Sequence, residues 1–89
     1  MKDKVAEAVF GGRRPKGFPS DLFSVARRRL AMLDAAPTLE SLRVPPGNRL
    51  HALKDDRAGE HAIRINDEFR ICFRWTDAGP PDVEIVDYH

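Results

Sequence analysis

The stretch His61–Trp75, HAIRINDEFRICFRW, decides the fold, because apolar and polar side chains alternate on both sides of a turn signal. The apolar positions are Ile63, Ile65, Phe69, Ile71, Phe73 and Trp75. The residues that alternate with them are His61, Arg64, Arg70, Cys72 and Arg74. Successive side chains of a strand point to opposite faces, so this period of two predicts two strands with one apolar face. Asn66 and Asp67 predict the turn that joins the two strands into a hairpin.

The segments that flank the hairpin predict two helices before it and one strand after it. Residues 2–10 carry apolar side chains at helical spacing, and the glycines at positions 11 and 12 end that pattern. Ser20 is the expected N-cap of a second helix. The stripe of that helix is Leu22, Val25, Ala26, Arg29, Leu30 and Leu33. Residues 83–88 form the expected last strand, since apolar side chains recur along them.

The order of these segments predicts an α+β fold, in which two N-terminal helices pack on one face of a mostly antiparallel sheet. We expect residues 1–89 to form a single domain. No apolar run approaches the ~18 residues of a membrane span, so the composition favours a soluble globular protein with no membrane partner. The single cysteine, Cys72, excludes an internal disulfide and fits a reducing cytosol. We therefore expect a cytoplasmic protein.

The net charge of +1 conceals an uneven distribution along the chain. Residues 1–30 contain eight Lys and Arg but three Asp and Glu, whereas residues 31–89 contain seven and eleven. Such asymmetry allows the basic half to meet a polyanion. The candidate residues for contact with a polyanion are Arg13, Arg14, Lys16, Arg27, Arg28 and Arg29. The alternative is a basic loop and helix that are merely solvated.

The hairpin pattern also predicts which face of the sheet carries the candidate site residues. If Phe69, Ile71 and Phe73 face the helices, Arg70 and Arg74 must project from the second face of the sheet, which we expect to be polar. The residues expected by strand position on or beside that face are His51, Lys54, Arg70, Asp87, Tyr88 and His89.

Two stretches resemble the HigB-type toxins of the RelE/ParE superfamily: GNRLHALKDDRAGEHAIRINDEFRICFRW at residues 47–75 and VEIVDYH at residues 83–89. The segment ARRRLAMLDAA at residues 26–36 extends the similarity to the second helix. The resemblance implies a microbial RNase fold and a ribosome-dependent endoribonuclease that cuts mRNA in the decoding site. It also implies neutralisation by a helix-turn-helix antitoxin of the HigA type, with operator DNA bound only through that antitoxin. Relatives open with a short extended segment, which we expect to be missing or very short here.

By position, the resemblance places the functional residues at His51, Lys54, Arg70, Asp87, Tyr88 and His89. RNA supplies its own 2′-hydroxyl nucleophile, so these residue types suffice for cleavage by a metal-independent endoribonuclease. Imidazole titrates near neutral pH, which makes His89 the first candidate for proton transfer, with Asp87 to hold or charge it. His51 is a candidate for a second acid or base. Asp87 and Tyr88 have opposite strand parity, so both face substrate only if the strand ends or twists there.

Arg70 and Lys54 are candidates to bind phosphate oxygens, and Tyr88 to stack on a base. Each site residue also has a structural alternative. Arg70 can pair with Glu84 or Asp87, Lys54 can be solvated, His51 can be a half-buried structural residue, and Tyr88 can seal the sheet edge. The histidines lack close ligand spacing, so we expect no metal and no cofactor.

Two further functions stay open: a noncatalytic ParE-like gyrase poison and a degenerate toxin retained as an antitoxin-binding scaffold. The ending Asp87-Tyr88-His89 favours the enzyme.

Overall fold

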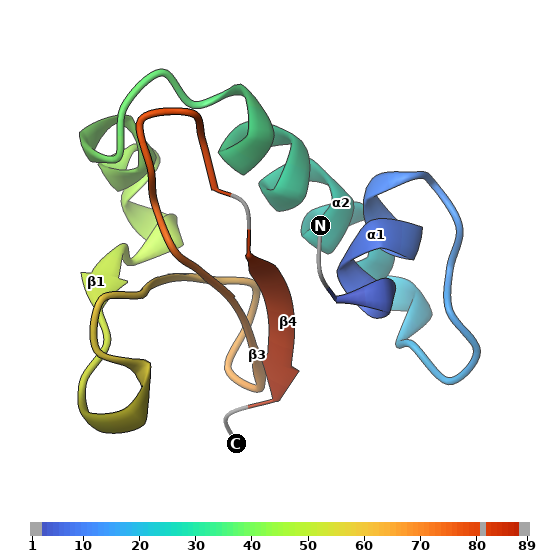
Figure 1. The fold of residues 1–89 in the computed structure, drawn as a ribbon. Coiled ribbons are helices and arrows are strands. Elements are labelled where there is room, and N and C mark those ends of the chain that lie inside the picture. Colours follow the sequence, from blue (N-terminus) through green and yellow to red (C-terminus); the bar gives the residue numbers. More distant parts are fainter. Residues whose placement is uncertain (1–2, 81, 88–89) are drawn as a thin grey trace.

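The computed structural model describes residues 3–80 and 82–87 (Figure 1). Two α-helices come first, α1 at Lys4–Phe10 and α2 at Ser20–Ala35. Three short 3₁₀ segments follow α2 at intervals, η1 at Glu40–Arg43, η2 at Pro46–Asn48 and η3 at Asp55–Arg57. The strands are β1 at His51–Ala52, β2 at His61–Arg64, β3 at Phe69–Phe73 and β4 at Val83–Asp87. They form one antiparallel sheet in the order β1-β2-β3-β4, which confirms the predicted α+β fold.

The core lies between the two helices and one face of the sheet. Ala6 and Val9 of α1 and Leu30 of α2 pack in one apolar cluster with Ile71 and Phe73 of β3. These side chains are fully buried. The predicted apolar set of the hairpin therefore faces the helices, as the alternation indicated.

The hairpin turn follows the sequence prediction. Ile63 pairs with Ile71 across β2 and β3, so the apolar positions of both strands share a face. In the turn, the side-chain oxygen of Asn66 accepts hydrogen bonds from the backbone N–H groups of Glu68 at 3.0 Å and Phe69 at 2.7 Å. The Asn side chain thus takes the place of a backbone acceptor in the turn.

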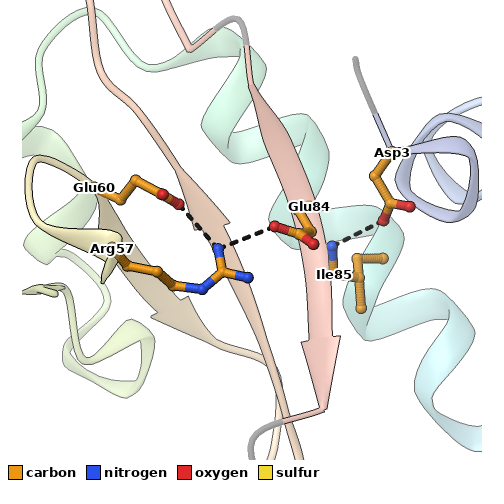
Figure 2. Close-up of polar contacts among 5 residues, drawn as sticks. All are labelled: Asp3, Arg57, Glu60, Glu84 and Ile85. Atoms are coloured by element: carbon orange, nitrogen blue, oxygen red, sulfur yellow. Dashed lines mark hydrogen bonds and ion pairs between the residues drawn. The ribbon is translucent and has the colours of Figure 1, made fainter. Parts of the chain in front are cut away.

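Asp3 joins the start of α1 to the edge strand β4 (Figure 2). Its carboxylate accepts from the first backbone N–H groups of the helix, those of Val5 and Ala6, each at 3.3 Å. It also accepts from the N–H of Ile85 at 3.0 Å. One carboxylate therefore caps the helix and satisfies a donor on the outer edge of β4, which fixes α1 against the sheet.

The second helix begins one residue earlier than predicted. Ser20 is its first helical residue rather than its N-cap, and Pro19 holds the cap position with φ −58° and ψ 125° and no side-chain hydrogen bond. The Pro19 carbonyl accepts from the N–H of Leu22 at 3.2 Å. Proline already has the φ angle that a residue at the helix entry needs, so the helix starts directly after it.

The second face of the sheet is less polar than predicted. Ala62 of β2 and Cys72 of β3 are register partners on this face, and both are fully buried. Burial raises the pKa of the Cys72 thiol, although the nearby guanidinium groups of Arg70 and Arg57 act in the opposite direction. The prediction of a polar face was wrong at its centre, where the small side chains of Ala62 and Cys72 are removed from solvent.

Candidate functional site

An open depression on the second face of the sheet lies among β1, η3 and β3. Its volume is about 490 Å³. The residues that line it are His51, Ala52, Leu53, Lys54, Asp55, Asp56, Arg57 and Arg70. Three of the predicted site residues, His51, Lys54 and Arg70, thus line one depression although up to 19 positions separate them in the chain.

The position of His51 follows from the pairing of β1 with β2. His51 is the register partner of Ala62, and it is exposed. Its Nδ1 lies 2.8 Å from the carbonyl oxygen of Arg49. A carbonyl oxygen only accepts, so this contact requires a proton on Nδ1 and leaves Nε2 as the basic nitrogen of the neutral ring. The imidazole is therefore held in the form in which Nε2 can take up a proton.

Arg70 and Lys54 supply positive charge to the depression. Arg70 is the register partner of Arg64 on β2 and of Val86 on β4, and it is half-buried. It lies on the face opposite Phe69 and Ile71, as the strand parity predicted. Lys54 is exposed at the start of η3, where its carbonyl accepts from the N–H of Arg57 at 3.1 Å.

Arg57 is a residue of this site that the sequence reasoning missed. Its Nη1 donates to Glu60 at 3.1 Å and to Glu84 of β4 at 3.0 Å (Figure 2). The hydrogen bond to Glu84 is the main cause that raises the pKa of Arg57. The i,i+3 spacing of Arg57 and Glu60 was a signal for the first pair. Glu84 is 27 positions away, and only the folded sheet brings it to Arg57.

Asp87 lies apart from this depression. It is the register partner of Phe69, so it belongs to the face that the helices cover. There it borders an apolar hollow of about 300 Å³ with Val5, Lys16 and Phe18. Asp87 was expected on or beside the second face. A place on that face is wrong, because Asp87 has the strand parity of Ile85 and not that of Val86, the register partner of Arg70. Its role in the site stays a prediction from the sequence.

The remaining two predicted catalytic residues, Tyr88 and His89, lie outside the described residues. Their roles stay predictions from the sequence.

The six basic candidates divide into an exposed group and one internal residue. Arg13, Arg14, Lys16, Arg27 and Arg28 are exposed. Arg29 is half-buried and donates to the side-chain oxygen of Asn48, a fully buried residue whose Nδ2 donates to the carbonyl of Leu42 at 3.0 Å. Burial, followed by the charges of Arg28 and Arg64, lowers the pKa of Arg29. Arg29 thus links α2 to η2.

Among residues 3–80 and 82–87, no group of three or more His, Cys, Asp and Glu side chains is arranged to hold a metal ion. Within the same ranges, none of the helices combines the length and the apolar character needed to cross a membrane.

Comparison with known proteins identifies the family. Toxin HigB-1 of Vibrio cholerae serotype O1 is 38% identical over 78 residues, which cover 86% of this chain and 82% of that protein. An uncharacterized protein of Haemophilus influenzae is 33% identical over 57 residues, or 64% of this chain and 56% of that protein. The sequence model of the HigB-like toxins, described as the RelE-like toxin of the type II toxin–antitoxin system HigB, matches residues 1–89. The chain therefore belongs to the HigB-like family of RelE-like toxins, and as a member of a type II toxin–antitoxin system it has an antitoxin as its partner.

Proposed function

We propose that this toxin is a ribosome-dependent endoribonuclease that inhibits translation in the cytoplasm by cutting mRNA in the decoding site. The observation that carries the proposal is the depression lined by His51, Lys54 and Arg70 on the second face of the sheet. It combines a basic imidazole nitrogen with two cations, and those groups are what cleavage of an RNA phosphodiester requires.

The reaction begins with removal of the proton from a ribose 2′-hydroxyl by a general base. The 2′-oxygen forms a bond to phosphorus, the bond from phosphorus to the 5′-oxygen breaks, and a general acid gives a proton to that oxygen. The products are a 2′,3′-cyclic phosphate and a 5′-hydroxyl. No metal ion is needed, because Arg70 and Lys54 can stabilise the charge on the phosphorane oxygens.

The two proton-transfer roles fall to His51 and His89. Nε2 of His51 is the basic nitrogen of a ring whose other nitrogen is held by the Arg49 carbonyl, which suits a base in the depression. His89, assigned from the resemblance, is the partner that completes the acid–base pair. Tyr88 is assigned to stacking on the substrate base.

The exposed cations Arg13, Arg14, Lys16, Arg27 and Arg28 are proposed to bind the phosphates of ribosomal RNA. The proposed partners are the 70S ribosome, mRNA and a HigA-type helix-turn-helix antitoxin, through which operator DNA is bound. The exposed cations of the N-terminal half support the proposed contact with the ribosome.

Purified toxin added to a translation extract tests the proposal, with the 5′ ends of the mRNA mapped by primer extension. Cuts inside codons that require ribosomes support it. Unbroken mRNA, with accumulation of gyrase-cleaved DNA in a parallel assay, would assign the chain to the gyrase poisons. Unbroken mRNA and uncleaved DNA, with retained antitoxin binding, would identify a degenerate scaffold.

A further inference from the structure

Arg57 connects two parts of the chain that meet only in the fold. It is the last residue of η3, and one nitrogen of its guanidinium contacts Glu60, which precedes β2, and Glu84, which lies on the edge strand β4 (Figure 2). The side chains are 34% exposed for Arg57, 20% for Glu60 and 49% for Glu84. The three groups therefore form a partly buried network, in which one ordered side chain serves two ion pairs.

This network lies between the two segments that carry the candidate site residues. His51 and Lys54 immediately precede η3, and Arg57 lines the same depression. Glu84 is on the strand that leads to Tyr88 and His89. A fixed Arg57–Glu84 distance thus ties the segment that begins with Lys54 to β4, while the pairing of β1 with β2 holds His51.

The other hydrogen bonds of the segment 53–60 are local. The N–H of Leu53 donates to Glu60 O at 2.9 Å, and the N–H of Ala58 donates to Asp55 O at 3.0 Å. These bonds shape the turn without joining it to β4, whereas the Arg57–Glu84 pair spans 27 positions.

Charge argues against a direct role of Arg57 in binding RNA. Two carboxylates share its guanidinium, so the local group has an excess of negative charge and is a poor ligand for phosphate. Lys54, which is exposed, and Arg70 on β3 line the same depression and are better placed to supply the positive charge.

We propose that Arg57 is a positioning residue, which acts through Glu84 to hold the segment 53–60 against β4 and so keeps Lys54 aligned with Arg70 and with His51, which the pairing of β1 with β2 holds in place. The inference rests on the proposed function for its effect on catalysis, but its structural part stands independently. Small displacements of reacting groups are sufficient to slow an enzyme severely.

The test uses two variants that break the link from opposite sides, Arg57→Met and Glu84→Thr. Methionine keeps an unbranched apolar stem without the guanidinium group, and threonine suits a strand but is too short to reach Arg57. Glu40→Gln is the matched control, because it removes the exposed Glu40–Arg43 pair at 2.6 Å in η1, outside the depression.

The first readout is hydrogen exchange at the amides of Leu53, Arg57, Ala58 and Glu60. We expect faster exchange in Arg57→Met and in Glu84→Thr, and no change in Glu40→Gln. Unchanged exchange in both link variants would overturn the proposal, whatever the activity of the protein.

The second readout is single-turnover cleavage on programmed ribosomes, with ribosome affinity measured separately. Each link variant should lose about tenfold in the cleavage rate at saturating ribosomes, with affinity unchanged, and the double variant should be no slower than either single one. The reversed pair, Arg57→Glu with Glu84→Arg, should recover part of the rate. A loss in Arg57→Met with full activity in Glu84→Thr would overturn positioning and make Arg57 a direct ligand. A wild-type protein that does not cleave, together with faster exchange in both variants, would refute the proposed function and leave the structural link standing.

Discussion

Asp87 of β4 and Phe69 of β3 are register partners, which places the Asp87 carboxylate on the helix-covered face while Arg70 lies on the other. The side chains of Asp87 and Arg70, on adjacent strands, therefore lie on opposite faces of the sheet. The chemistry proposed for the depression depends on His51, Lys54 and Arg70, and Asp87 is not among the residues that line it.

Asp87→Asn is therefore expected to reduce cleavage less than His51→Ala. His51 lines the depression, whereas Asp87 borders the hollow near Lys16. Loss of a positioned acid or base lowers the cleavage rate by about 10²-fold or more, which is the loss we expect for His51→Ala. The cleavage rate of Asp87→Asn should stay within about tenfold of that of the wild type. Single-turnover rates of the two variants, compared at equal ribosome occupancy, check the order. A slower Asp87→Asn would place its carboxylate in the mechanism.

The neighbouring arginines of α2 should separate into binding and stability effects. Arg29→Met should lower the free energy of unfolding by about 1–3 kcal/mol, since the buried Asn48 oxygen loses its donor. Arg28→Met should leave stability nearly unchanged and reduce the salt dependence of ribosome binding, because exposed Arg28 would no longer displace a counterion. Urea denaturation and ribosome binding at two salt concentrations measure the two effects. Equal stability losses in both variants would contradict the structural role of Arg29 in joining α2 to η2.

Cys72 should make stability fall in alkaline solution. Burial raises the pKa of its thiol in the folded protein above the ordinary value of 9.0. The protonated form is thus favoured by folding, so this contribution is present in full below the unfolded pKa and is lost as pH rises toward the folded pKa. The free energy of unfolding of the wild type should fall more steeply above pH 9.0 than that of Cys72→Ala. Parallel pH profiles would show that the thiol ionises equally well in the fold.

A side chain at Gly59 should destabilise the fold, whereas Gly47 should accept one without loss. Gly59 has φ +93°, and a Cβ there would lie 2.7 Å from a guanidinium nitrogen of Arg74. The backbone strain dominates because the Arg74 side chain can move, so Gly59→Ala should cost about 1–2 kcal/mol. At Gly47 the nearest atom to an added Cβ is Arg29 Nη2 at 3.9 Å, and φ lies outside the left-handed region. Thermal melting of both variants measures the difference, and an equal loss in the two would contradict the strain argument.

Local patterns were sufficient to predict the helices, the hairpin and its turn. The alternation of Ile71 and Phe73 with Arg70 gave the correct core face, and Asn66 marked the turn that its side chain closes. These features depend on neighbours in the sequence, whose spacing can be read directly.

Long-range pairs account for what the sequence did not predict. Arg57–Glu84, Asp3–Ile85 and Arg29–Asn48 each join segments whose approach depends on the complete fold. The burial of Ala62 on the second face has the same origin, since alternation alone cannot say what covers a strand. The site residues His51 and Lys54 were expected by strand position and through the resemblance, and the fold adds that they share a depression with Arg70.

The most direct measurement of the central claim is single-turnover cleavage of mRNA on programmed 70S ribosomes by the wild type, Arg70→Ala and the control Arg43→Ala, with a melting curve for each. Arg70 lines the depression on the face opposite the core, whereas Arg43 is exposed in η1. We predict ribosome-dependent cuts by the wild type and by Arg43→Ala that leave a 2′,3′-cyclic phosphate. We predict a loss of about 10²-fold or more in Arg70→Ala, with its thermal transition retained. Full cleavage by a folded Arg70→Ala, or the absence of any cut by the wild type on translating ribosomes, would contradict the account.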